Sequence, residues 1–559
     1  MIERIKHLVQ EATGEKDVHI EIPQAESQGH YSTNIAMKLA KGVKKNPLTL
    51  AEEFAARIKA GDKEGMFEKV SAVPPGFINF WIAPSVLQES LREIRKSDKD
   101  WGKPEKKARK TMVIDYSHPN IAKPMSVAHL RSTIIGDALY RIFKFSGWKS
   151  IGDNHLGDWG KQFGILIAAW KELKEKPKQI VIEDLMKLYV DYNARMKEDK
   201  ALEDRARAEV KKLQDGDREN VKIWKEFYKI SLNEFKKVYD ILGVTFDEYL
   251  GESFYKDMLP GIIEDALKSG VAEKSEGAII IPFADKPPFV IQKSDEAFLY
   301  STTDLAAVQY RVKKTKADLM LYVVDNGQSL HFEQLFDAVK KLGYVTDEKL
   351  VHVKFGLILG EDLKKLATRS GKHISLQAVI EEAIEKAEAV VNQKRSDLSE
   401  KERKEIGRAV GIAALKYNDL SQNRQSDIAF KWEKMLNLEG NSAPYLMYTH
   451  ARLKSILRKA KAPRSFGAEK LTTPQELGLI RKLLGFPDVI HIVTQNYFPH
   501  YLTDYLFGLA QMTNAYYHGE SILKSEPEVR DARLAFIVAI AQTMETGLGL
   551  LGISAPEKM

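Results

Sequence analysis

Residues 115–136 read D-Y-S-H-P-N-I-A-K-P-M-S-V-A-H-L-R-S-T-I-I-G. The apolar residues 112–114 just before them predict a short buried strand, and a loop bracketed by Pro119 and Pro124 follows. The loop then opens a helix whose first turn carries His129. α/β proteins hold phosphate with this order of elements, because unpaired backbone N–H groups and the helix N-terminus both attract anions. The stretch therefore predicts a parallel-sheet fold that handles a nucleotide.

The loop has its own chemistry. It lacks the glycines of a dinucleotide-binding fingerprint or of a Walker loop. Side chains must therefore supply much of the grip on a phosphate, and Lys123 and His129 are the cations placed to do so. A histidine in the first turn of a helix is also common as a cap or a surface residue, and this is the alternative for His129.

The composition excludes several classes of function. The 559 residues include 85 basic and 78 acidic ones, and the net charge of +7 suits contact with RNA without establishing it. The chain has no cysteine, which excludes disulfides, thiolate zinc sites and cysteine nucleophiles. No apolar run approaches the roughly 20 residues of a membrane span, and the start lacks the apolar core of a signal peptide. We expect a soluble, cytoplasmic protein with more than one domain.

Hydrophobic patterns divide the chain into three parts. Residues 1–105 mix helices and strands. In residues 106–373 strands alternate with helices, which predicts a parallel sheet, and a charged helical insertion interrupts it at about residues 171–275. The sheet is then expected to resume with the runs A-I-I-I-P, F-V-I-Q, L-M-L-Y-V-V and V-H-V-K-F-G-L-I-L. From residue 374 to the end only helices are predicted.

The opening segment resembles a known family. S-x-P-N-x-A-K-P followed by H-L-R-S-T-I-I-G is similar to the "HIGH" region of class I aminoacyl-tRNA synthetases, and more narrowly to that of arginyl-tRNA synthetases. The likeness covers nearly the whole chain. It implies a multidomain α/β protein with a Rossmann-like parallel-sheet catalytic domain. It also implies an α+β N-terminal domain that contacts the tRNA elbow and an all-α C-terminal anticodon-binding bundle.

The same resemblance implies an activity. The chain is expected to be an arginine–tRNA ligase, with L-arginine, ATP and tRNA(Arg) as its substrates and Mg²⁺ carried on the ATP phosphates. Arginine and ATP would give arginyl-adenylate, and the arginyl group would pass to the 3′-terminal adenosine of the tRNA. Members of this family generally require bound tRNA before they activate arginine, and the same is expected here.

The residues expected at ATP follow from the chemistry and from the resemblance. Adenylate formation accumulates negative charge at the α-phosphate, so the site needs preorganised cations and N–H donors. Lys123, Ser126 and His129 are placed to supply them. The run L-A-T-R-S-G-K resembles the family's mobile KMSKS loop and would bring Arg369 to the phosphates. The remaining ATP contacts implied by the resemblance are Ala128, Thr368, Ser370 and, near the ribose, His331.

The chain departs from the family pattern at three positions. Ser126 replaces the first histidine of the H-x-G-H signature, and Ala128 replaces its glycine. A hydroxyl group can still bond a phosphate oxygen, whereas the methyl group of Ala128 sits where adenine usually packs. Ala367 stands where the phosphate loop usually has a leading lysine, for which three lysines are candidate substitutes: Lys123, Lys364 and Lys365.

A selective arginine pocket needs an unpaired acid in a fixed place with hydroxyl or amide partners, because the guanidinium group is planar and has five donors. Tyr300 and Asp304 are four residues apart and can share one side of a strand-to-helix junction. In the resembled family this pair holds the guanidinium group. Asp115 and Asn120 match positions that hold the substrate's ammonium and carboxylate, and Gln328 matches a third contact. The alternatives are helix caps for Asp304 and Gln328 and a core position for Tyr300.

Candidate RNA contacts lie near both ends of the chain. Near the start, an exposed Tyr31 and Asn34 could stack on and bond a flipped loop base. Near the end, three side chains at spacing i, i+3 and i+7 share a helix face, and the last residue matches the family's terminal methionine. Buried tyrosines in a bundle are the alternative for this set. These candidate anticodon contacts are Tyr445, Tyr448, Arg452 and Met559.

Two rival functions remain open. One is a synthetase for another amino acid, such as glutamine or cysteine, against which the pair Tyr300 and Asp304 and the lack of cysteine both argue. The other is a non-catalytic tRNA-binding paralogue, which the changes at Ser126, Ala128 and Ala367 favour. We expect no structural zinc, no protein-bound metal site, no membrane partner and a monomer.

Overall fold

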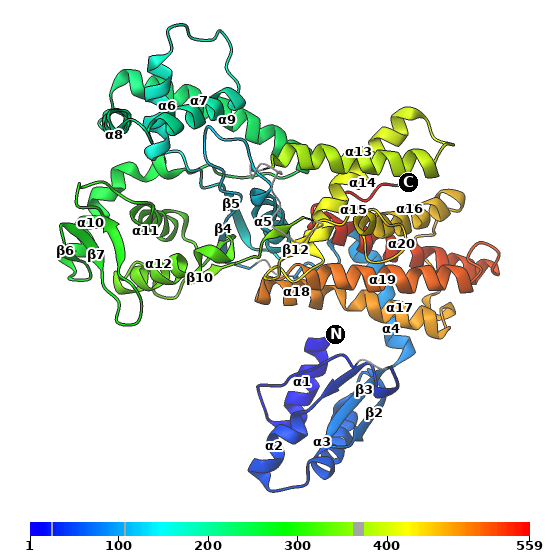
Figure 1. Ribbon diagram of the computed structural model, residues 1–559. Coiled ribbons are helices and arrows are strands. Elements are labelled where there is room, and N and C mark those ends of the chain that lie inside the picture. The colour runs from blue at the N-terminus through cyan, green and yellow to red at the C-terminus, as the bar shows by residue number, and fades with distance from the viewer. Residues whose placement is uncertain (24–25, 106–107, 361–373) are drawn as a thin grey trace.

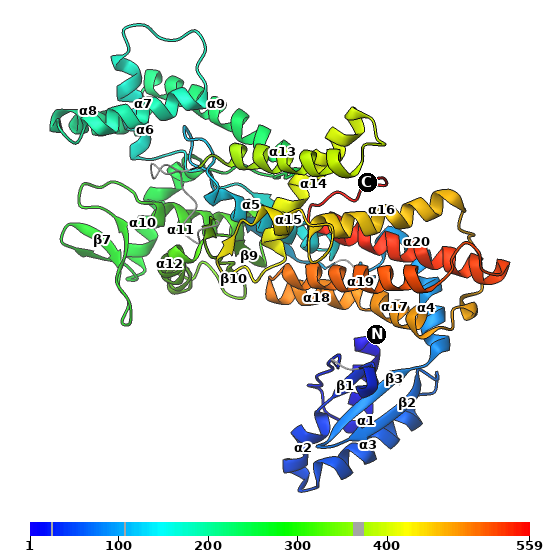
Figure 2. The same cartoon turned by 45° about the vertical axis from the view of Figure 1, so that its right-hand side comes forward.

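The computed structural model describes residues 1–23, 26–105, 108–360 and 374–559. Three parts follow one another along the chain, with the N-terminal part lying apart from the sheet-containing part and beneath the helical bundle (Figures 1 and 2). Within the described ranges, every helix is too short or too polar to cross a membrane. The limits predicted at residues 105 and 373 stay predictions, because both border residues outside these ranges.

The N-terminal part is built around an antiparallel sheet with strand order β1-β3-β2. The rings of Phe67 and Phe80 lie 5.1 Å apart across β2 and β3 and join the core beneath the sheet. Helix α4 leaves this part and packs against α17 and α20, so the chain reaches the bundle before it enters the sheet-containing part. The elements are α1 (Ile2–Thr13), β1 (Tyr31–Thr33), α2 (Ile35–Val43), α3 (Pro47–Gly61), β2 (Phe67–Val73), β3 (Phe77–Ile82) and α4 (Pro84–Ser97).

The second part contains a parallel sheet of order β10-β9-β4-β5, as predicted. Its two central strands, β4 and β9, are short, apolar and almost wholly buried, which is typical of strands that are covered on both faces. The chain adds strands first on one side of β4 and then on the other, and ligands bind at such switch points, beyond the carboxyl ends of the strands. The strands and their crossover helices are β4 (Thr111–Asp115), α5 (Ala128–Phe145), β5 (Lys149–Asp153), β9 (Leu319–Tyr322), α12 (Ser329–Lys341) and β10 (Lys349–His352).

Two predicted strands form, but not in this sheet. β7 (Ala278–Ile281) and β8 (Phe289–Gln292) pair with β6 (Glu273–Ser275) in a separate antiparallel sheet. The prediction that the runs A-I-I-I-P and F-V-I-Q continue the parallel sheet is therefore wrong. The connections between these strands are too short for a parallel crossover, which needs a dozen or more residues, so hairpins form instead.

A helical insertion lies at the top of Figures 1 and 2. Its helices pack on one another, and α6 approaches α8 so closely that a Cβ atom at Gly164 would lie 2.1 Å from the carbonyl oxygen of Ala206. The chain returns to the parallel sheet through α10 and α11. These helices are α6 (Lys161–Glu172), α7 (Ile182–Arg195), α8 (Lys200–Gln214), α9 (Arg218–Leu242), α10 (Leu259–Lys268) and α11 (Tyr300–Tyr310).

The C-terminal part is a helical bundle, as predicted. One small exception to the prediction of helices alone is β12 (Ile428–Ala429), which pairs in parallel with β11 (Ile358–Leu359). The helices are α13 (Leu376–Lys394), α14 (Glu400–Leu420), α15 (Trp432–Met435), α16 (Ala443–Lys459), α17 (Pro474–Leu484), α18 (Phe486–Asn496), α19 (His500–Gly519) and α20 (Pro527–Leu550).

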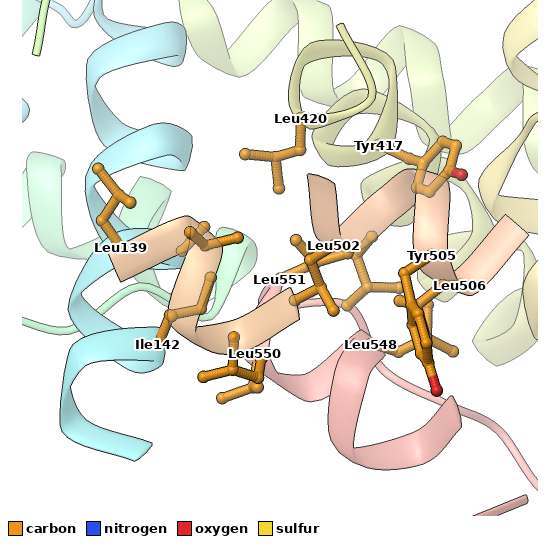
Figure 3. Packing of buried hydrophobic residues seen from close by; sticks show 14 of the residues in the cluster. Leu139, Ile142, Tyr417, Leu420, Leu502, Tyr505, Leu506, Leu548, Leu550 and Leu551 are labelled. Atoms are coloured by element: carbon orange, nitrogen blue, oxygen red, sulfur yellow. The ribbon is translucent and has the colours of Figure 1, made fainter. Parts of the chain in front are cut away.

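Helix α5 is shared between the sheet and the bundle. On one side a Cβ atom at Gly136 would lie 2.3 Å from the ring of Tyr116, so this glycine lets α5 lie directly against the end of β4. On the other side Leu139 and Ile142 lie near apolar side chains of the bundle, among them Leu550 (Figure 3). The helix that carries His129 is thereby fixed to both parts.

Candidate active site

A buried ion cluster lies at the carboxyl ends of β4 and β5. Asp115 and Asp153 end these two strands, and Nη2 of Arg311 donates to Oδ2 of Asp115 at 2.6 Å and to Oδ2 of Asp153 at 2.8 Å. Burial alone would raise the pKa of Asp115, but the charges of Arg311, His118 and neighbouring His155 outweigh it and leave the pKa below its ordinary value. Asp115 is therefore a carboxylate at neutral pH.

His155 connects this cluster to the predicted guanidinium pair. Burial on its own would lower the pKa of His155, but the charges of Asp115 and Asp304 raise it above its ordinary value. Both acids must lie within electrostatic range of one imidazole ring to have this effect. Asp115, from the end of β4, and Asp304, from α11, therefore both lie within electrostatic range of His155.

Tyr300 and Asp304 lie one turn apart on α11, and both contact His331. Oδ2 of Asp304 lies 2.7 Å from Nε2 of His331, and the ring of Tyr300 lies 4.9 Å from the same imidazole. The helix begins at Tyr300, so Asp304 stands in its second turn and is not the cap that was the alternative. Tyr300 is 59% exposed, which excludes a core position. The two side chains share one face, as predicted.

Asn120 and Lys123 lie in the loop after β4. The backbone N–H of Ile121 donates to the carbonyl oxygen of Gly157 at 3.1 Å, and the Asn120 side chain crosses so near Gly157 that a Cβ atom there would lie 2.2 Å from Oδ1. Nζ of Lys123 lies 4.5 Å from the ring centroid of Tyr189 on α7, and burial lowers the pKa of this lysine. Lys123 therefore contacts the helical insertion.

Nδ1 of His129 lies against Ser126. It is 3.0 Å from the backbone nitrogen of Ser126 and 3.2 Å from both the hydroxyl and the carbonyl oxygen of that residue. When Nδ1 accepts, a neutral ring carries its hydrogen on Nε2, which is then a donor. The contacts of Nδ1 with Ser126 agree with the capping alternative. Ala128, the first residue of α5, is exposed, and within the described chain no side chain caps this helix end.

The segment after the parallel sheet holds this loop. The backbone N–H of Val127 donates to the carbonyl oxygen of Ile374 at 3.0 Å, and that of Leu376 donates to Met125 at 2.8 Å. Ile374, the first described residue after the predicted phosphate loop, therefore lies next to Val127. The residues of the phosphate loop itself fall outside the described ranges, and these include Lys364, Lys365, Ala367, Thr368, Arg369 and Ser370.

Gln328 is exposed at the N-cap position of α12. Among the described residues its side chain makes no capping hydrogen bond, so the capping alternative does not describe it. Its contact with a substrate stays a prediction.

The predicted RNA contacts divide into two groups. Tyr31 is only 2% exposed because β1 pairs with β3 and carries the ring into the core, so the expectation of an exposed ring for base stacking is wrong. Asn34, at the start of α2, is exposed. Tyr448 is 40% exposed, which the alternative of buried bundle tyrosines does not explain.

The four candidate anticodon contacts in the bundle line one cavity. Tyr445, Tyr448, Arg452 and Met559 all line a cavity of about 580 Å³ between α13, α14, α16 and α19. The guanidinium group of Arg452 lies 4.8 Å from the ring of Tyr448 and 5.0 Å from that of Tyr517. A basic group between aromatic rings at an open cavity is suited to an unstacked base.

Four important residues were not predicted. Asp153 and His155 follow a strand directly in the run I-G-D-N-H-L-G-D, and the rule that strand ends carry ligands could have identified them. Arg311 begins the basic run R-V-K-K-T-K, which looks like a solvated surface. Tyr517 lies on α19 and meets Arg452 only through the fold, so it had no local signal.

Glu252 makes a pH-dependent contribution to stability. Burial raises the pKa of its carboxyl group to about 7, with Asp158 adding to the effect and His155 opposing it. Because this pKa lies above the ordinary value of 4.5, the contribution is complete below about pH 4.5 and is lost as the pH rises through 7. In the unaltered chain this group should lower the free energy of unfolding by about 2 kcal/mol between pH 5 and pH 8, and Glu252→Gln should remove that fall. Denaturant unfolding of both chains at these pH values checks this, and identical pH dependence would contradict it.

Comparison with known proteins agrees with this geometry. Residues 91–432 match the family described as "tRNA synthetases class I (R), catalytic domain". Residues 1–82 match "Arginyl tRNA synthetase N terminal domain" and residues 446–559 match "DALR anticodon binding domain". The parallel sheet carries a polar loop and His129 at its carboxyl edge, and a helical bundle follows it. Together with the family matches, this arrangement identifies the chain as a class I aminoacyl-tRNA synthetase.

Individual relatives identify the branch of this class. The arginine–tRNA ligase of Fusobacterium nucleatum is 40% identical over 554 residues, which cover 97% of this chain and 96% of the relative. That of Chloroflexus aggregans is 42% identical over 536 residues, or 94% and 93% of the two chains. The crystal structure of arginyl-tRNA synthetase from Plasmodium falciparum gives a TM-score of 0.86 at 29% identity and covers 100% of this chain and 98% of its own. The chain belongs to the arginyl-tRNA synthetase family, and its activity is that of an arginine–tRNA ligase.

Proposed function

We propose that the chain activates L-arginine with ATP to arginyl-adenylate at the carboxyl edge of β4, β5 and β9, and then transfers the arginyl group to the 3′-terminal adenosine of tRNA(Arg). The observation that carries this proposal is the position of Asp304. Its side chain is 22% exposed, lies beside Tyr300, and shares an electrostatic neighbourhood with the strand-end acid Asp115. In this proposal Asp304 receives the guanidinium group of arginine, and Asp115 receives its ammonium group.

The substrate's guanidinium group binds Asp304 and Tyr300 in this proposal, and it displaces His331 from Oδ2 of Asp304. The ammonium group binds Oδ1 of Asp115, a buried atom without a hydrogen-bond partner in the described chain. The substrate's carboxylate lies at Asn120, and Gln328 gives the third contact. Free lysine should bind poorly as a substrate, because its ammonium group does not match a site shaped for a planar guanidinium group and would leave buried acceptors unpaired.

ATP lies at the N-terminal end of α5, with Mg²⁺ on its phosphates as part of the substrate. Ser126 and the Nε2 donor of His129 supply hydrogen bonds to the phosphates, and Lys123 supplies charge. Ala128 packs beside the adenine base, and His331 adjoins the ribose once arginine has displaced it. The phosphate loop adds Thr368, Arg369 and Ser370. The reaction needs positioning and charge stabilisation, and no side-chain nucleophile.

tRNA contacts the enzyme at two separated surfaces. The anticodon loop enters the 580 Å³ cavity at Tyr445, Tyr448, Arg452 and Met559, and Asn34 in the N-terminal part meets the tRNA elbow. One chain supplies all of these contacts, so the enzyme acts as a monomer, and we place it in the cytoplasm with the translation machinery. Structural zinc has no role in this proposal, since the chain lacks cysteine.

Pyrophosphate exchange, measured with each of the twenty amino acids in the presence and absence of tRNA(Arg), tests the proposal. Exchange is expected with arginine alone, and only when tRNA(Arg) is present. Exchange with glutamine or cysteine would instead indicate a synthetase for that amino acid. A chain that binds tRNA tightly but supports no exchange would be the non-catalytic paralogue.

A further inference from the structure

Arg311 occupies an unusual place for a residue without an assigned role. It is 2% exposed and lies two turns beyond Asp304, where α11 passes into the π-helical turn Arg311–Thr315. Its guanidinium group lies 5.3 Å from the ring of Tyr322 at the end of β9, and it binds the terminal acids of β4 and β5. One side chain therefore ties the helix that carries the guanidinium pair to three strands of the parallel sheet.

The two oxygens of Asp115 have different environments. Oδ2 accepts from Arg311, whereas Oδ1 lies 3.2 Å from Nδ1 of His118 and has no hydrogen-bond partner in the described part of the chain. Buried polar atoms are normally satisfied, and an exception calls for an explanation such as a missing ligand. Since Arg311 engages one oxygen firmly, it also decides which way the other oxygen faces.

We propose that Arg311 is a positioning residue for arginine binding: it orients Asp115 so that Oδ1 faces the substrate's ammonium group, and it fixes Asp304 at a set distance from that oxygen. The inference rests on the proposed arginine–tRNA ligase function. Arg311 does not touch the substrate. It acts through Asp115, and through α11 it keeps the acceptors for the two cationic ends of one arginine molecule in register.

Lysine should not replace Arg311. Nη2 of Arg311 binds both carboxylates while the planar guanidinium group lies against the ring of Tyr322. The ammonium group of lysine is a compact point charge on a flexible stem and has no plane to lie against that ring. Arg311→Lys keeps the positive charge but loses this fixed geometry. The expected result is a KM for arginine raised about ten-fold or more, with little change in the KM for ATP or for tRNA(Arg).

The test measures aminoacylation by the full chain with each substrate varied in turn. Arg533→Lys is the matched control, because Arg533 is 8% exposed, binds Glu476 at 2.8 Å and Glu520 at 2.7 Å, and lies in the bundle. Each variant removes a buried arginine that binds two acids, so the midpoint temperature of thermal unfolding should fall in both. Only Arg311→Lys should raise the KM for arginine.

Coupling between residues provides a second measurement. Asp115→Asn should raise the KM for arginine too, and the double variant with Arg311→Lys should be no worse than the poorer single variant. If Arg311→Lys does not fold, Asp153→Asn serves instead, since it releases Arg311 from β5 and should raise the KM for arginine several-fold. An unchanged KM for arginine in a folded variant, or effects that multiply in the double variant, would overturn the inference. A wild-type chain that fails to charge tRNA(Arg) would contradict the proposed function instead.

Discussion

Asp304→Asn should lower kcat/KM for arginine by about 10³-fold in tRNA-dependent pyrophosphate exchange. In the proposed pocket this carboxylate pairs with the guanidinium group, whereas an amide presents an uncharged oxygen and an N–H₂ group that faces other donors. Removing one partner of a desolvated charge pair leaves the other unpaired, which accounts for an effect of this size. Steady-state exchange with arginine and ATP varied separately measures it.

Three companion variants make the result specific. Asp337→Asn alters an acid on α12 that pairs with Lys286 at 2.6 Å on the surface, and it should leave exchange unchanged. Tyr300→Phe removes only a hydroxyl group and should cost about ten-fold. His331→Gln breaks the pairing with Asp304 without removing the acid, so it should cost far less than Asp304→Asn. Equal losses in His331→Gln and Asp304→Asn would contradict the direct role of the carboxylate.

His129→Ala should reduce kcat by a factor on the order of 10²–10³, with a similar loss in exchange and in the single-turnover rate of adenylate formation. In the proposed site Nε2 donates to the phosphates, and the contacts of Nδ1 with Ser126 hold the ring in place, so little reorganisation is needed when charge develops. Transfer from preformed arginyl-adenylate should be affected much less, because the phosphate chemistry is complete by then. Rapid-quench measurements of the two steps separate these outcomes.

Ser126→Ala is the matched comparison for His129. It removes a hydroxyl group 3.2 Å from Nδ1 but keeps the backbone N–H that fixes the ring. Its loss in kcat should therefore be well below that of His129→Ala. If the two variants are equally impaired, the histidine acts mainly through the loop structure and not as a phosphate donor.

Local patterns in the sequence predicted the central element of the fold. The apolar strand, the polar loop and the helix that carries His129 follow one another within about forty residues, and short-range spacing determines all three. Tyr300 and Asp304 were predictable for the same reason, since a separation of four residues places two side chains on one helix face. Their common contact with His331 could not be read from that spacing.

Pairing over long distances was harder to predict. An apolar run shows that residues 278–281 form a strand but not which strand is its neighbour, and the short connections gave hairpins instead of the parallel sheet. The prediction of an exposed Tyr31 was wrong because its strand pairs with β3 in the core, and no local pattern shows that pairing. Arg311 is 196 residues from Asp115, so nothing near either residue shows that they meet.

Because α5 packs against both the sheet and the bundle, amino-acid activation and anticodon recognition should depend on the same folded unit. Arg131 on this helix is buried against Asp419 of α14, with its Nε 3.1 Å from Oδ1, and it also binds the backbone around Ser426. We therefore expect that the bundle cannot unfold while the nucleotide site stays folded, because α5 belongs to both. Heating should therefore extinguish amino-acid activation and anticodon recognition at the same temperature, and a severed bundle should leave behind an insoluble remnant instead of a minimal enzyme.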